Sequence, residues 1–215
     1  MGSHRHRAAA LLALVAFILP AGKAFAGPTA LTQAYAQKNG GFPIKLTKSG
    51  SYIFQGDILP TAGVNGIEVS APYVTIDLNG FLLHGGNAAN AGITTTGNAL
   101  TVKNGTIGHF KNEGVFAPTS YVVIENMRVV ENGLTGVHVG RSASITGSTI
   151  AGNGQDGILV ASGIILGNII ESNLELGIEG AAGYGNNTLY NNNGGGTQVT
   201  GPIRLQPNAC VPACP

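Results

Sequence analysis

The feature that most constrains this chain is an internal repeat in which a Gly is followed by Ile or Val. The pair recurs at six glycines, with a weaker copy at a seventh: Gly66, Gly92, Gly114, Gly136, Gly157 and Gly177, and then Gly196. Successive steps are 26, 22, 22, 21, 20 and 19 residues. A repeat of this period is typical of a solenoid, in which each coil buries its apolar stripe against the next coil.

Two further apolar columns keep a constant distance from these glycines. The second column is Val102, Ile124, Ile145, Ile165 and Tyr184, and the third lies five residues further on, at Ile107, Val129, Ile150, Ile170 and Leu189. The apolar residues that follow the repeat glycines form the first column: Ile67, Ile93, Val115, Val137, Ile158 and Ile178. Three short segments with period-2 alternation predict three short parallel strands per coil, stacked about 4.8 Å apart, with these columns facing inward.

A column of asparagines lies eight residues after the second apolar column. It contains Asn132, Asn153, Asn173 and Asn192, with Phe110 in the equivalent place of the preceding coil. Asn favours sharp bends because it tolerates the left-handed conformation and bonds its own backbone. We therefore interpret this column as a stack of corner residues whose side chains hydrogen-bond to one another. Sugar contact is the functional alternative for the same residues.

The first 26 residues are expected to be a secretory signal peptide. Arg5 and Arg7 precede an apolar run over 8–19, and an A-x-A cleavage site follows at 24–26. The run is shorter than the roughly 20 residues that span a membrane. We therefore expect a secreted or periplasmic protein of bacterial type, with no membrane contact once residues 1–26 are removed.

The charge balance argues against nucleic acid and anionic membranes as partners. Without the signal peptide the chain keeps 8 Lys and Arg against 10 Asp and Glu. A basic stripe that could grip nucleic acid or an anionic membrane is missing from the sequence. Extracellular polysaccharide or a cell-surface component is the expected partner, and the sequence carries no signal of oligomeric state.

Several motifs together point to a known superfamily. The Gly-Ile/Val strands, the Asn corners and segments 41–52, 74–80 and 207–210 resemble the right-handed parallel β-helix of the pectate-lyase-like superfamily. Within it, the chain is most similar to small exported bacterial β-helix repeat proteins. The resemblance covers about residues 41–215 and implies a right-handed coil. A leucine-rich repeat has a comparable period, but the chain lacks the L-x-x-L-x-L run.

The expected fold is an all-β, right-handed parallel β-helix of about seven three-strand coils. Residues 27–49 are predicted to form an N-terminal cap, with a short helix within 29–38, and residues 50–200 the β-helix. Residues 201–215 are rich in Pro, which cannot donate to a further strand, and are predicted to form the C-terminal cap.

The only two cysteines of the chain lie in this last segment. Cys210 and Cys214 are expected to form a disulfide, because an exported chain favours paired cysteines. A redox site is the alternative, although the spacing is C-x3-C rather than C-x-x-C.

Catalytic residues are sparse. The resemblance implies lyases that hold calcium with several carboxylates beside a basic proton acceptor, or hydrolases with paired Asp. Here Asp57, Asp77 and Asp156 lie in different coils, so no metal or other cofactor is expected. Glu113, His138 and Asp156, on or beside three successive first strands, are the one conceivable acid/base group.

Aromatic residues near the same strands suggest binding instead. Phe116, Tyr121 and Tyr73 could stack on sugars, or could cover the turn-side flank of the core. An insertion at 84–90 could line a small binding edge or be a tolerated surface loop. The leading hypothesis is a non-catalytic structural or carbohydrate-surface-binding module. A polysaccharide lyase or glycoside hydrolase is the alternative, and a building block that docks through its capped ends is a third possibility.

Overall fold

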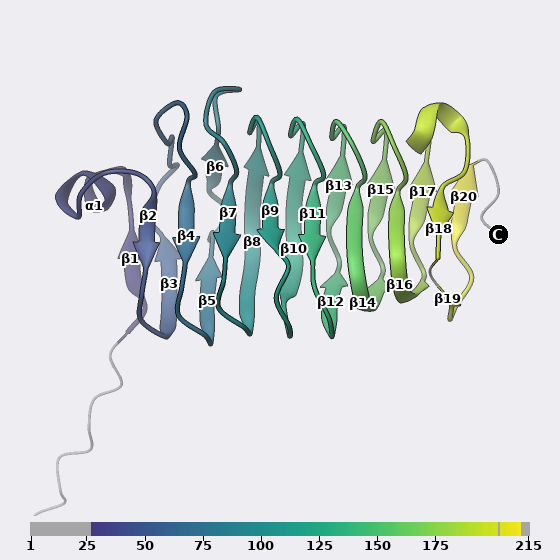
Figure 1. Ribbon diagram of the computed structural model, residues 1–215, viewed down its shortest axis with the longest axis horizontal. Helices are drawn as coiled ribbons and strands as arrows, with labels where there is room; N and C mark the ends of the chain where they lie inside the picture. Colours follow the sequence, from purple (N-terminus) through teal and green to yellow (C-terminus); the bar gives the residue numbers. More distant parts are fainter. Residues whose placement is uncertain (1–26, 202, 212–215) are drawn as a thin grey trace, which may run out of the picture.

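The computed structural model describes residues 27–201 and 203–211, which form a parallel β-solenoid of about nine coils. All of the described strands that pair do so in parallel with strands of neighbouring coils. Figure 1 shows the coils side by side along the long axis, with the N-terminal helix at one end. The predicted signal peptide, residues 1–26, lies outside the described residues.

The strands stack in three faces. The first face contains β2 (Ile44–Leu46), β4 (Ile67–Val69), β7 (Ile93–Thr95), β9 (Val115–Ala117), β11 (Val137–Val139), the first parts of β14 (Ile158–Leu166) and β16 (Ile178–Gly185), and β18 (Val199–Thr200). These are the strands nearest the viewer in Figure 1.

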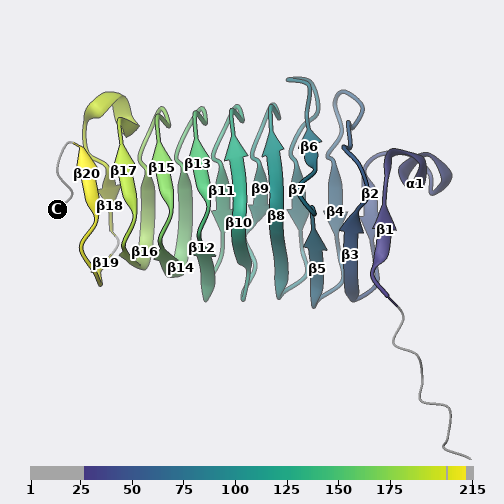
Figure 2. The ribbon, with the colours of Figure 1, turned by 180° about the vertical axis from the view of Figure 1, so that it is seen from behind.

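The second and third faces lie on the opposite side, which Figure 2 shows. The second face contains β1 (Thr29–Leu31), β3 (Gly50–Phe54), β5 (Val74–Asp77), the first parts of β8 (Leu100–Gly108) and β10 (Val123–Val130), β12 (Ala143–Thr146), the second parts of β14 and β16, and β19 (Ile203–Arg204). The third face contains β6 (Leu82–His84), the second parts of β8 and β10, β13 (Thr149–Ala151), β15 (Ile169–Glu171), β17 (Thr188–Tyr190) and β20 (Ala209–Val211).

The number of coils exceeds the seven predicted because both ends also contribute strands. At the N-terminal end β1 and β2 pair with β3 and β4. The repeat hides β2 because Pro43 stands where later coils have Gly. At the C-terminal end β18, β19 and β20 extend all three faces. Pro207 lies between β19 and β20, outside the strands, so its missing N–H does not interrupt the hydrogen bonds of the sheet.

Helical structure is confined to two short segments of the described chain. Helix α1 spans Gln33–Lys38, and the Thr32 hydroxyl caps it by accepting a hydrogen bond from the Tyr35 N–H at 2.9 Å. Residues 29–31, which the helical pattern included, form β1 instead because Leu31 joins the core. A short 3-10 segment, η1 (Asn192–Gly195), lies near the other end. Within 27–201 and 203–211 no helix has the length and apolar character needed to cross a membrane.

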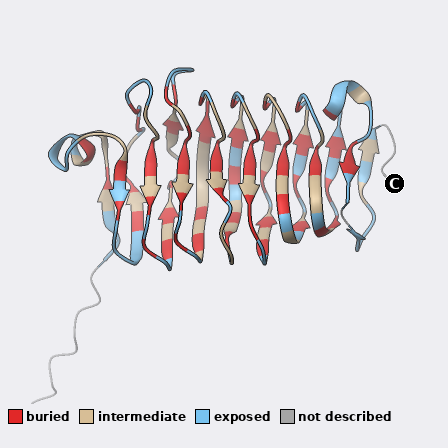
Figure 3. Cartoon of the chain, viewed as in Figure 1, coloured by how far each residue is buried: buried red, intermediate tan, exposed pale blue. Residues whose placement is uncertain are grey.

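The three predicted apolar columns form the core. Every member of the first, second and third columns is at most 1% exposed. Figure 3 shows the same alternation along the strands, with buried positions between less buried ones. Stacked side chains of one kind fill the interior of successive coils, so removal of this surface from water stabilises the solenoid along its whole length.

The turn between the first and second faces shortens toward the C-terminus until the strands fuse. In β14 and β16 one strand runs through the corner, with a register shift between Val160 and Gly163. Gly180 lies at this corner with φ +120°, and a Cβ there would collide with the Val160 carbonyl oxygen. The fused corner leaves no loop to wall a cleft, so a deep pocket on the first face can form only toward the N-terminus.

The predicted asparagine column is confirmed as a buried chain of hydrogen bonds. The Asn132, Asn153 and Asn173 amides donate to the next side-chain oxygen at 3.0, 2.8 and 2.8 Å. Asn192 ends the chain by donating to Gln198 at 2.8 Å. We expected these asparagines to adopt the left-handed conformation. Instead, the residue before each of them adopts it, as Glu131 does with φ +54°. The bend is made one residue earlier because the Asn side chain must point inward to reach the next coil.

A second polar column, which we did not predict, lies at another corner of the coils. Ser148, Asn168, Asn187 and Asn208 lie between the second and third faces, and each side-chain oxygen after the first accepts the preceding backbone N–H at 2.9 Å. The sequence signal is a constant offset of three residues after the second apolar column. Two corners of each C-terminal coil are thus fixed by buried amides.

Candidate functional site

Outward side chains of the first face form a row along the long axis of the molecule. In register, the row is Lys45, Glu68, Thr94, Phe116, His138, Leu159, Glu179 and Thr200. The strand alternation positions them, because their neighbours in sequence are the inward core residues. A ligand lying along this face meets one such side chain in each coil.

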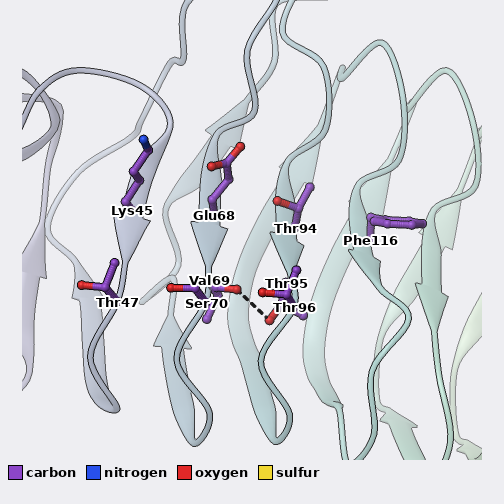
Figure 4. Close-up of a pocket in the computed structure, with 9 residues that line it drawn as sticks. All are labelled: Lys45, Thr47, Glu68, Val69, Ser70, Thr94, Thr95, Thr96 and Phe116. Atoms are coloured by element: carbon purple, nitrogen blue, oxygen red, sulfur yellow. Dashed lines mark hydrogen bonds between the residues drawn. The ribbon is translucent and has the colours of Figure 1, made fainter.

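A pocket of about 440 Å³ opens on the N-terminal half of this row. Its wall contains the outward residues Lys45, Glu68, Thr94 and Phe116, the hydroxyl residues Thr47, Ser70 and Thr96, and also Val69 and Thr95. Figure 4 shows the first group in one row and the hydroxyl residues in a second row nearer the turns. The Thr95 hydroxyl is used internally, since it donates to the Val69 carbonyl oxygen at 3.1 Å. The pocket therefore combines an aromatic ring, hydroxyl groups and two charged groups.

His138 packs against Phe116. The two rings meet edge to face, with centroids 5.1 Å apart. Burial lowers the pKa of the His138 imidazole, and the nearby Glu113 carboxylate opposes this by raising it. The neutral imidazole continues the aromatic surface that begins with Phe116.

Asp156 contacts another carboxyl group. It is 4% exposed, and its Oδ1 accepts a hydrogen bond from the Leu176 N–H at 2.9 Å. The pKa of Asp156 is raised to about 7, chiefly by burial. A hydrogen bond with Glu179 and the charges of Glu179 and Glu175 contribute to the rise, and the hydrogen bond from the Leu176 N–H opposes it. Of the three predicted acid/base residues, Glu113 thus raises the pKa of His138, whereas Asp156 interacts with Glu179 and Glu175.

The two tyrosines named as sugar contacts do not cover the core. Tyr73 and Tyr121 are 74% and 63% exposed, at the corner between the first and second faces. Both adopt positive φ, at +55° and +63°. Phe116 is half-buried in the pocket wall. All three rings are therefore at least partly exposed to solvent.

The inserted loop at 84–90 lies at another corner of the molecule. His84, at the end of β6, packs on His109 with ring centroids 4.6 Å apart. The His109 Nδ1 lies 3.3 Å from the Glu131 carboxylate. The pocket wall on the first face contains none of these three residues.

The sequence predicts a disulfide between Cys210 and Cys214 and no metal site. Cys210 lies in β20, in register with Leu189, whereas Cys214 is outside the described residues, so the disulfide stays a prediction. Over residues 27–201 and 203–211, His, Cys, Asp and Glu side chains form no group of three or more that could hold a metal ion.

The sequence analysis missed the N-terminal part of the site. Lys45 and Thr47 belong to the coil that has Pro43 instead of a repeat Gly, so the row began at Glu68. The Asp156–Glu179 contact was missed because one residue precedes its strand and the other lies within the next strand. The alternating segment Ile44-Lys45-Leu46 could have revealed the first omission, whereas the second depends on how the coils stack.

The comparison with family models agrees with this fold. The family model described as "Right handed beta helix region" matches residues 29–163. Among solved structures, the Azotobacter vinelandii mannuronan C-5 epimerase AlgE4 A-module is similar with a TM-score of 0.26 and 12% identity, over 74% of this chain and 70% of that chain. A search of curated proteins found no match.

Proposed function

Because the chain belongs to the family of right-handed β-helix regions, we propose that it is an exported, non-catalytic module that binds carbohydrate surfaces through its first face. The observation that carries this proposal is the pocket of about 440 Å³ walled by outward residues of four consecutive coils. Export to the cell exterior or periplasm is part of the proposal and rests on the basic and apolar sequence at 1–26.

The chemistry of the pocket suits a sugar. Sugar rings present apolar C–H faces that pack on aromatic side chains, and Phe116 offers such a surface beside the Thr94 hydroxyl. The exposed hydroxyls of Thr47, Ser70 and Thr96 both donate and accept hydrogen bonds, as sugar hydroxyls do. A concave site with a few convergent polar groups is the usual form of a small-ligand pocket.

The repeat also suits a polymer. Neighbouring strands of a face lie about 4.8 Å apart, so a chain of sugars laid along the axis meets equivalent positions again and again. Beyond the pocket the row continues through His138 and Leu159, which form a mostly apolar track. A pocket that can hold one sugar, followed by a row that continues along the axis, favours a polysaccharide as the ligand over a free monosaccharide.

A screen of residues 27–215 on a polysaccharide array tests the proposal. Binding and the release of new reducing or unsaturated ends are read from the same spots. We expect retention on at least one polysaccharide with no released ends. Silence on every polysaccharide would overturn the binding function.

Glycoside hydrolysis is a second candidate, favoured by the Asp156 carboxyl group. With a pKa raised to about 7, chiefly by burial, this group is still partly protonated at neutral pH, as a general acid must be. Its direct hydrogen bond with Glu179 argues against that role. Hydrogen-bonded oxygens lie about 2.5–3 Å apart, whereas glycosidase carboxyl pairs stand about 5 Å apart or more.

Product release separates the two functions. If the hydrolase function holds, reducing ends appear on the array and disappear in Asp156→Asn and Glu179→Gln. If the binding function holds, both variants retain polysaccharide without products.

A further inference from the structure

The two charged groups in the pocket balance each other without forming an ion pair. Lys45 and Glu68 are register partners in β2 and β4. Their charged groups are not within ion-pair distance, and the Glu68 carboxylate instead accepts a hydrogen bond from the Asn65 amide at 2.9 Å. Figure 4 shows both side chains beside the pocket, with Thr94 and Phe116 following along the row. The pocket thus offers a hydrogen-bonding cation and anion with no net charge.

Toward the C-terminus the first face and its bordering turns carry only acidic groups, because the sequence has no Lys or Arg between Arg141 and Arg204. Glu113 and Asp156 directly precede the glycines that begin β9 and β14, Glu175 lies two residues before that of β16, and Glu179 points outward from β16. Glu113 acts on His138, and Glu175 and Glu179 act on Asp156, so these charges lie close to the row.

The basic side chains nearest in sequence lie off the strands. Lys48, Lys111 and Arg141 belong to the turns that border the first face. Arg141 is the last of them before Arg204, so the strands and turns of the first face from residue 142 onward carry no Lys or Arg. Along the strands of the face, Lys45 is therefore the single cation among the described residues.

This distribution distinguishes between classes of polysaccharide. A polyuronate carries one carboxylate on every sugar, so a chain along the axis would place its charges against Glu113, Glu175 and Glu179. Like charges brought together at an interface disfavour the wrong partner. A neutral chain escapes this repulsion, and its hydroxyl groups can donate to the same carboxylates.

We infer that the first face selects uncharged polysaccharides and rejects polyuronates, an inference that rests on the carbohydrate-binding function proposed above. Lys45 and Glu68 bind hydroxyl groups of one sugar in the pocket. The carboxylates toward the C-terminus provide the repulsion that excludes a polyanion.

Matched oligosaccharides test this selectivity. Hexamers of glucose, mannose and galactose are titrated into residues 27–215 by calorimetry, each beside the uronate hexamer of the same linkage, at pH 8 and low salt. We expect a neutral hexamer to bind on the order of tenfold more tightly than its uronate counterpart. Added salt should narrow the difference, because it screens the repulsion.

A variant that removes two of the carboxylates tests whether repulsion causes the selectivity. Glu175→Gln with Glu179→Gln should strengthen uronate binding severalfold and leave neutral binding nearly unchanged. The matched control is Glu171→Gln on the third face, which should change neither.

The outcomes separate this inference from the function beneath it. A uronate hexamer that binds as tightly as its neutral counterpart, or a double variant without effect on uronate binding, overturns the selectivity and leaves carbohydrate binding standing. Failure of all six hexamers to bind overturns the binding function itself.

Discussion

Asp156 makes the stability of the folded chain depend on pH. Its pKa is 3.8 for the free side chain and about 7 in the fold, chiefly because burial penalises the charged form. Between these values the folded state holds a proton that the unfolded state has released. The stability contributed by this group is therefore present at pH 4 and is lost progressively as the pH rises to about 7. The sequence shows an Asp before a repeat Gly. Its contact with Glu179, in the strand that pairs with β14, depends on how the coils stack.

Asp156→Asn should remove this pH dependence. Asn has the shape of the protonated acid, so it can still accept from the Leu176 N–H and donate to Glu179. We expect the variant to be more stable than the wild type at pH 8 and nearly equal to it at pH 4. Urea unfolding at several pH values measures the difference. Asp77→Asn, which removes an ion pair of 3.9 Å with Lys103, is the control and should show no gain at pH 8. Parallel pH profiles for Asp156→Asn and the wild type would contradict the assignment.

At the scale of elements, the polar and apolar columns stabilise the coils by different interactions. The apolar columns supply the burial that stabilises each strand, while the amide columns satisfy backbone groups at the corners. Periodicity predicts the apolar columns well because one inward residue repeats at every coil. It predicts the corners less well. The bend and the buried amide are adjacent residues, as at Glu131 and Asn132, and a sequence pattern does not separate them.

Asn153→Ala should cost about 3 kcal/mol of unfolding free energy. The change deletes the amide that donates to Asn173 and the oxygen that accepts from Asn132, and it leaves buried donors without partners. Asn112→Ala is the control, because this half-buried side chain faces a turn, and should cost within about 0.5 kcal/mol. Urea unfolding of both variants measures the costs, and equal losses would refute a special role for the amide column.

A charge placed inside the first face should unfold the solenoid. Ile158 is fully buried between register partners in β11 and β16, and Ile158→Asp leaves a carboxylate there without a partner. Leu159→Asp places the same charge one residue along, on the outward surface, and should cost less than about 1 kcal/mol. Circular dichroism should lose the strand signal only in Ile158→Asp. An intact signal in that variant would disprove the inward assignment.

At the scale of the whole molecule, the lengths of the turns decide where a site can form. The coils are longest near the N-terminus and shorten until β14 and β16 each run through a corner. The pocket accordingly lies over β2, β4, β7 and β9. The sequence predicts the repeat and most of the outward row. It could not predict the pocket, because Lys45 and Phe116 come to line one pocket only once the coils stack, and the coil of Lys45 lacks its repeat Gly.

The most direct test of carbohydrate binding by the first face is calorimetric titration of one polysaccharide from the array into three proteins. These are the wild type, Phe116→Ala and Tyr190→Ala. Tyr190 is a half-exposed aromatic residue on the third face, away from the pocket. We predict that Phe116→Ala weakens binding about tenfold or more while Tyr190→Ala binds as the wild type does. Unchanged affinity in Phe116→Ala, or an equal loss in Tyr190→Ala, would contradict the placement of the site on this face.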